Sequence, residues 1–143
     1  MILVDTNVVS EMMRVSPNVR VRAWLNAQTE DALFVSAVSL AELWLGVALL
    51  PQGRRRRDLT ATVAERIADY FGARLLPFDA VAAEIYAQIV ADARVRGVTI
   101  GMADGQIAAT ALVQGLAVAT RDTTPFVAAG LRVIDPWTAP TPD

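Results

Sequence analysis

The sequence predicts an α/β domain in which a central, mostly parallel β-sheet is flanked by α-helices. Short apolar runs alternate with helical patterns along the chain, which is the element order of a parallel sheet with crossover helices. The short runs are apolar at consecutive positions, as expected for strands covered on both faces. With 143 residues, 54% of them hydrophobic, the chain is long enough to form one domain with a substantial core.

The first half of the chain contains two predicted strands and four predicted helices. The strands are residues 2–4 and 33–36, and the helices are residues 8–13, 17–27, 40–50 and 55–71. Ser16 is a candidate N-cap and Pro17 a candidate first residue for the second helix. Pro51 and Gly53 end the third helix.

The second half contains three predicted strands, residues 74–76, 116–119 and 131–134. Between the first two, Asp79 caps a helix that runs to Arg96 and stops at Gly97, and a further helix covers residues 102–113. We expect one domain over residues 1–137 and a frayed C-terminal tail over residues 138–143.

The composition excludes several kinds of chemistry. The chain has no His, no Cys and no Lys, and all 13 basic residues are Arg. This excludes nucleophiles activated by His, Schiff-base chemistry and ordinary zinc sites. Carboxylates gathered in one place would instead bind hard cations such as Mg²⁺ or Mn²⁺. A net charge of −2 and a pI near 5.1 argue against strong non-specific binding to nucleic acid.

Three absences predict a cytoplasmic location. Without Cys there is no disulfide framework, and no apolar run reaches the roughly 20 residues of a membrane span. The N-terminus lacks the basic region of a secretory signal and reads as a strand instead.

Two acids directly follow predicted strands. Asp5 comes after residues 2–4, and Asp122 lies just past the strand LeuAlaValAlaThr. Ligands of α/β sheets bind at the carboxyl ends of the strands, so both acids are candidate site residues. Each also has a structural interpretation, because Asp5 could cap the following helix and Asp122 could form a turn before Pro125.

Two further acids lie near the starts of predicted helices. Glu42 could complete a capping box with Ser39, but it is the lone ionisable group of a helix that is apolar nearly all round. We expect that helix to be buried, and a buried carboxylate needs a partner or a cation. Asp104 could simply complement the helix macrodipole, although the helix that follows it is otherwise uncharged.

Together the four acids predict a metal site. Carboxylates within a few ångströms of one another raise each other's pKa, and a divalent cation removes that conflict. One or two Mg²⁺ ions held this way can activate water toward a phosphodiester without any His. Small polar side chains at Thr6, Asn7 and Thr120 could orient the carboxylates.

The sequence resembles the PIN-domain proteins, in the branch of VapC-type toxins from bacterial toxin–antitoxin pairs. The stretches MILVDTNVVSE, SAVSLAELWLGVALL, MADGQIAATA and LAVATRDTTPF stand in the order and spacing typical of that family. Similarity to the FitB subgroup extends to LPFDAVAAEIYAQI and to the DPW near the C-terminus. The resemblance runs from Met1 to about Trp137.

The resemblance implies a PIN-like fold and a metal-dependent endoribonuclease. It implies that Asp5, Glu42, Asp104 and Asp122 bind Mg²⁺ or Mn²⁺, with Thr120 and Asn7 as polar neighbours. It also implies a homodimer and a cognate antitoxin that occupies a groove, with DNA bound only through the antitoxin. No membrane partner is implied.

The run Arg54, Arg55, Arg56 and Arg57 is the main charge block. Four cations at a helix N-terminus oppose the macrodipole, so local stability does not explain them. They could contact RNA phosphates or acidic groups of an antitoxin. Trp24, Leu25, Trp44 and Leu49 add large apolar surface that a dimer or antitoxin interface could cover.

Two other functions remain open from the residues alone. The first is a non-catalytic protein that binds an antitoxin within an operator-DNA complex. The second is a phosphoacceptor or phosphatase with an Asp nucleophile, which is disfavoured because such sites use a Lys near the phosphoryl group and this chain has none.

Overall fold

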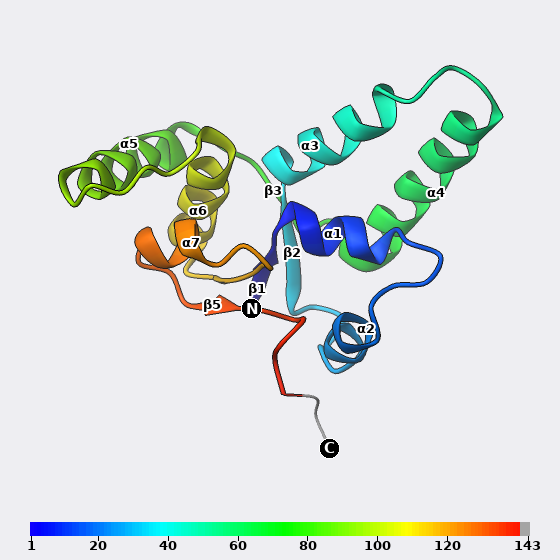
Figure 1. Ribbon diagram of the computed structural model, residues 1–143, viewed down its shortest axis with the longest axis horizontal. Coiled ribbons are helices and arrows are strands. Elements are labelled where there is room, and N and C mark those ends of the chain that lie inside the picture. The colour runs from blue at the N-terminus through cyan, green and yellow to red at the C-terminus, as the bar shows by residue number, and fades with distance from the viewer. Residues whose placement is uncertain (141–143) are drawn as a thin grey trace.

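The structure is a computed structural model that describes residues 1–140 (Figure 1). Its strands are β1 (Ile2–Val4), β2 (Leu33–Ser36), β3 (Leu75–Leu76), β4 (Ala117–Ala119) and β5 (Val133–Ile134). Its helices are α1 (Thr6–Met12), α2 (Val19–Asn26), α3 (Ala37–Ala48), α4 (Arg54–Phe71), α5 (Ala80–Val95), α6 (Met102–Gln114) and α7 (Thr124–Ala128). Over this range, none of the helices has the length and apolar character needed to cross a membrane.

The five strands form one parallel sheet in the order β3-β2-β1-β4-β5. The predicted α/β class is therefore confirmed. β1 pairs with β2 on one side and with β4 on the other, so the strand order reverses at β1. In such sheets the crevice at the carboxyl end of the reversal point is where ligands bind. The backbone N–H of Asp5, just past β1, donates to the carbonyl of Ala119 at the end of β4, 2.9 Å away.

The two faces of the sheet carry different helices. Alternating residues of a strand point to opposite faces. Ile2 and Val4 pack in a core with residues of α1, α2, α3 and α4, whereas Leu3 packs in a second core with α6 and α7. Figure 1 shows these groups on opposite sides of the sheet, with α1–α4 on the right and α5–α7 on the left.

Several predicted helix starts were wrong. The N-cap of α3 is Ser36, whose hydroxyl accepts the N–H of Ser39 at 2.9 Å. The helix therefore begins three residues before the predicted start, and Glu42 is too far along it to complete a capping box. The N-cap of α2 is Asn18 and not Ser16. Helix α7 was not predicted, because Pro125 was interpreted as part of a turn, although Pro is also favoured in a first helical turn.

The expectation that the helix carrying Glu42 is buried was also wrong. α3 and α4 form an arm that extends away from the sheet (Figure 1). Leu45 and Leu49 of α3 are 58% and 75% exposed, and Glu42 is exposed as well. Of the apolar residues singled out from the sequence, Trp24 is core, Leu25 and Trp44 are partly buried, and Leu49 is exposed.

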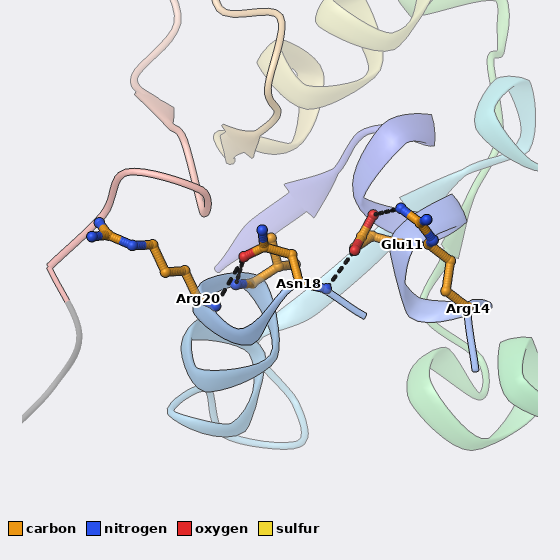
Figure 2. A network of polar contacts seen from close by, with 5 residues as sticks. Glu11, Arg14, Asn18 and Arg20 are labelled. Atoms are coloured by element: carbon orange, nitrogen blue, oxygen red, sulfur yellow. Dashed lines mark hydrogen bonds and ion pairs between the residues drawn. The ribbon is translucent and has the colours of Figure 1, made fainter. Parts of the chain in front are cut away.

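The far end of α1 is held by a polar network (Figure 2). The buried carboxylate of Glu11 accepts the backbone N–H of Asn18 at 2.5 Å and pairs with the guanidinium of Arg14 at 3.4 Å. The guanidinium of Arg66, on α4, donates to the carbonyl of Met12 at 2.6 Å. These contacts fix the direction of α1, whose opposite end carries Asp5.

The C-terminal segment continues past β5 in a turn. The backbone N–H groups of Thr138 and Ala139 both donate to the carbonyl of Asp135. Of the tail expected to fray, residues 138–140 are described, and residues 141–143 lie outside the described residues.

Candidate active site

Asp5 lies in the loop between β1 and α1 and is only 5% exposed. Its carboxylate accepts the backbone N–H of Thr6 at 2.7 Å, so it does cap α1. Burial raises the pKa of Asp5 above its ordinary value, and the charges of Glu42 and Asp122 raise it further. Hydrogen bonds from Thr120 and Thr6 act in the opposite direction. Asp5 is therefore both the N-cap of α1 and a member of the acidic group.

Thr120 joins the loops that follow β1 and β4. Its buried hydroxyl donates to the second carboxylate oxygen of Asp5 at 2.8 Å. The same hydroxyl oxygen accepts from the side-chain amide of Asn7 and from the backbone N–H of Asp122, each at 3.1 Å. A hydroxyl offers one donor and two acceptor lone pairs, so the hydrogen-bonding capacity of Thr120 is fully used. The position of Asp5 is thus tied to that of Asp122.

Glu42 reaches the site from α3. The hydroxyl of Thr6 donates to Glu42 Oε1 at 2.6 Å, although the two residues are 36 positions apart. Because the backbone N–H of Thr6 also holds Asp5, one residue fixes two carboxylates. Of the three residues predicted as polar neighbours, Thr6 and Thr120 donate directly to carboxylates, and Asn7 donates to Thr120.

Asp104 lies in the first turn of α6, whose N-cap is Gly101. Burial raises the pKa of Asp104 to about 6, and the charges of Asp5, Asp122 and Glu42 contribute after it. An acid in the first turn of a helix also complements the macrodipole, so that interpretation of Asp104 remains possible. The three acids whose charges act on Asp104 lie outside α6.

Gly105 is a site-forming residue that the sequence analysis missed. A Cβ at this position would lie 2.8 Å from a ring carbon of Tyr86 on α5, so only Gly lets α6 approach α5 this closely. Gly105 therefore holds the first turns of α6 close against α5, and Asp104 is the residue next to it. The available signal was a Gly inside a predicted helix, which often marks a packing requirement.

Asp122 lies in the exposed loop after β4, and its charge acts on both Asp5 and Asp104. The charges of Glu42 and Asp122 therefore both act on the two more buried acids, Asp5 and Asp104. Among residues 1–140, the ion pairs are Arg14–Glu11 and Arg54–Asp58, so none of the four has a basic partner in that range. Like charges that are partly buried without a counter-charge are costly, and the group is complementary to a cation.

The acidic group is open in this structure. Within residues 1–140, no three acidic side chains converge closely enough to form a finished metal shell. Glu42 is exposed and bonded to Thr6, and Asp122 is exposed on its loop. Both side chains can therefore turn toward Asp5 without leaving a packed core.

The four consecutive arginines are not brought into this group. Arg54 lies 4.0 Å from Asp58, and both side chains are largely exposed. Arg56 and Arg57 line a separate pocket of about 510 Å³ along α4, whose lining includes none of the four acids. The structure therefore separates the Arg run from the acidic site.

Comparison with known proteins agrees with the fold. Residues 2–130 match the model of the PIN domain family, and the chain therefore belongs to that family. It is 46% identical to "VapC ribonuclease Y4jK" of Sinorhizobium fredii, over 96% of this chain and 98% of that protein. It is 49% identical to "Toxin FitB" of Neisseria gonorrhoeae, over 96% and 99% of the two chains. A solved structure of FitAB bound to an IR36 DNA fragment superposes with a TM-score of 0.91 at 46% identity, covering 98% of each chain.

Proposed function

We propose that this protein is the toxin of a toxin–antitoxin pair, and that it is an endoribonuclease that hydrolyses RNA phosphodiester bonds with a divalent cation. One observation carries the proposal. The charges of Glu42 and Asp122 act on Asp5, which follows the strand where the sheet order reverses, and on Asp104, and none of the four acids has a basic partner within residues 1–140. The similarity of this protein to the VapC ribonuclease and to the FitB toxin, along nearly the whole chain, supports the same function.

The donor set fits a hard cation. Asp5, Glu42, Asp104 and Asp122 offer only oxygen atoms, as Mg²⁺ and Mn²⁺ prefer. The Thr6 and Thr120 contacts hold Asp5 and Glu42 while leaving further lone pairs on their carboxylates. When bound there, Mg²⁺ or Mn²⁺ would lower the pKa of water and stabilise negative charge on the phosphodiester.

The chain's own residues prepare the site. The loop after β1 and the loop after β4 are joined through Thr120, so their acids are held in register before any ligand binds. Burial of Asp5 and partial burial of Asp104 lower the local dielectric, which strengthens their attraction for a cation. Asn7 completes the arrangement by donating to Thr120 and accepting the backbone N–H of Arg121 at 3.3 Å.

The proposed partner is a cognate antitoxin, and DNA would be bound through it. FitAB, whose structure is similar to this chain, is bound to an IR36 DNA fragment, which supports this proposal. We also propose that the toxin is a homodimer in the cytoplasm. The exposed apolar residues Leu45 and Leu49 of α3, and the arginines Arg54–Arg57, are candidates for partner contact.

A cleavage assay tests the proposed activity. Purified protein should cleave single-stranded RNA with Mg²⁺ or Mn²⁺ and stop when EDTA is added, and Asp5→Asn should abolish cleavage. Asn keeps an oxygen acceptor for the N–H of Thr6, so α1 should remain capped. Asp31→Asn makes the same chemical change in the exposed turn before β2, at the opposite edge of the sheet, and should cleave normally. If cleavage survives in Asp5→Asn, or the wild type does not cleave with any divalent cation, the proposed activity is wrong.

A further inference from the structure

Arg121 stands beside the acidic site but is not neutralised by it. It lies between Thr120 and Asp122 in the loop after β4, and its backbone N–H is held by Asn7. Its side chain is exposed and has no acidic partner among residues 1–140. Among the described residues, its guanidinium instead makes a contact with an aromatic ring.

That contact is the ring of Trp137. The guanidinium carbon of Arg121 lies 5.3 Å from the centroid of the indole, which is the geometry of a cation–π interaction. Trp137 follows β5, the strand next to β4, so the pair stands at the same carboxyl edge of the sheet as the acids. The backbone N–H of Trp137 donates to the carboxylate of Asp135 at 2.9 Å, and its ring packs partly against the core. The indole is therefore a fixed platform.

We propose that Arg121, held by Trp137, binds the RNA strand next to the phosphodiester that is cleaved. This inference rests on the proposed function and names a substrate-binding element of the same site. RNA is a polyanion that must approach an edge lined with carboxylates, and a nearby guanidinium offsets that repulsion. A planar guanidinium can contact a phosphate through two N–H groups and can also stack with an unpaired base.

The contact with Trp137 keeps these donors available. A cation–π contact uses none of the guanidinium N–H groups in a hydrogen bond, and among residues 1–140 this guanidinium has no acidic partner, so its N–H groups can bind a phosphate. Trp137 thus acts as a positioning residue, and Arg121 as the residue that touches RNA. The two side chains should therefore contribute to RNA binding as a unit.

Steady-state kinetics and direct binding test this proposal. Arg121→Gln should raise KM for a single-stranded RNA of about ten nucleotides by about tenfold, with kcat nearly unchanged. In EDTA, where cleavage is stopped, the same fluorescently labelled RNA should bind more weakly to Arg121→Gln. The slope of log affinity against log salt should become shallower by about 0.7 for each phosphate that the variant no longer neutralises.

Matched variants separate this effect from a general loss of charge or of folding. Arg132→Gln removes an exposed arginine from the opposite edge of the sheet, just before β5, and should leave KM and the salt slope unchanged. Arg121→Lys keeps the charge but loses the planar fork, and should recover binding only in part. Trp137→Leu should raise KM like Arg121→Gln, with little added effect in the double variant, and Trp137→Phe should be milder.

Equal KM, RNA affinity and salt slope in wild type and Arg121→Gln would overturn the proposal. Equal effects of Arg121→Gln and Arg132→Gln would also overturn it, because they would indicate general electrostatics. If the wild type cleaves no RNA, the proposed activity fails by itself, and the binding experiment in EDTA still decides whether Arg121 contacts RNA.

Discussion

The two ends of helix α1 each carry a buried carboxylate, and their surroundings are opposite. Glu11, 7% exposed, is balanced by Arg14 and by the N–H of Asn18 (Figure 2). Asp5, 5% exposed, also receives two hydrogen bonds, but the charges that act on it are those of other acids. The two carboxylates are therefore similarly buried, but only Glu11 has a basic partner within residues 1–140. The carboxylate of Glu11 is neutralised within the chain, whereas the group around Asp5 has no basic partner within residues 1–140, which is the feature on which the proposed cation site rests.

Removing one acid from the unbalanced group should have the largest effect. Asp104→Asn should lower the rate of RNA cleavage by at least about a hundredfold, because a ligand of the cation and a negative charge are both removed. The thermal stability of the metal-free protein should stay the same or rise, since repulsion from Asp5 and Asp122 is relieved. Cleavage rates at saturating Mn²⁺ and differential scanning fluorimetry in EDTA measure the two effects. A large loss of stability would mean that Asp104 serves the fold.

The hydroxyl that joins the two site loops should come next. Thr120→Val keeps the shape of the side chain but removes the donor to Asp5 and the acceptor for Asn7. We expect cleavage or metal affinity to fall by about 10–100-fold, as for other groups that orient metal ligands. Thr120→Ser keeps the hydroxyl and should retain most of the activity. Equal activity of the Val and Ser variants would show that this hydrogen bond does not position Asp5.

At the balanced end of α1, a substitution should affect folding and leave the chemistry intact. Glu11→Ala removes the acceptor of the Asn18 N–H and should lower the free energy of unfolding by about 1–3 kcal/mol. Below its unfolding temperature the variant should cleave RNA at the wild-type rate. Urea denaturation and an assay at low temperature provide the two values. If cleavage falls as steeply as in Asp104→Asn, the contrast between the two ends of α1 is wrong.

The smallest expected effect is on the pH dependence of stability. Folding raises the pKa of Asp104 from 3.8 to about 6 and also raises the pKa of Asp5. At pH values between 3.8 and about 6, the folded chain therefore holds protons that the unfolded chain has released. Without metal, stability should therefore rise as pH falls from about 7.5 to about 5, and this gain should disappear as pH rises through about 6. Thermal unfolding in EDTA at several pH values measures the effect, and the Asp5→Asn, Asp104→Asn double variant should show less of it.

The sequence predicted the frame of the site well. Strands at residues 2–4 and 33–36 agree with the structure, because short apolar runs have few alternatives within an alternating α/β pattern. Asp5 and Asp122 were placed correctly after their strands, since parallel strands share one carboxyl edge.

What the sequence could not give depends on long-range packing. Glu42 was expected in a buried helix, but α3 covers the core with one face and leaves the other, with Glu42, exposed. Only the tertiary structure determines which apolar helix faces are covered. The start of α3 was misplaced because both Ser36 and Ser39 are suitable N-caps. The contacts of Thr6 with Glu42 and of Thr120 with Asp5 join residues 36 and 115 positions apart, so no local pattern could reveal them.

We propose that Asp5, Glu42, Asp104 and Asp122, which have no basic partner within residues 1–140, bind a divalent cation. Mn²⁺ binding is the sharpest test of this proposal, and it can be measured by the electron paramagnetic resonance signal of the free ion. The wild type should bind Mn²⁺, Asp104→Asn should bind it at least about tenfold more weakly, and Glu11→Gln should bind it like the wild type. Absence of binding to the wild type, or equal binding by Asp104→Asn, would contradict a cation site between the loops that follow β1 and β4.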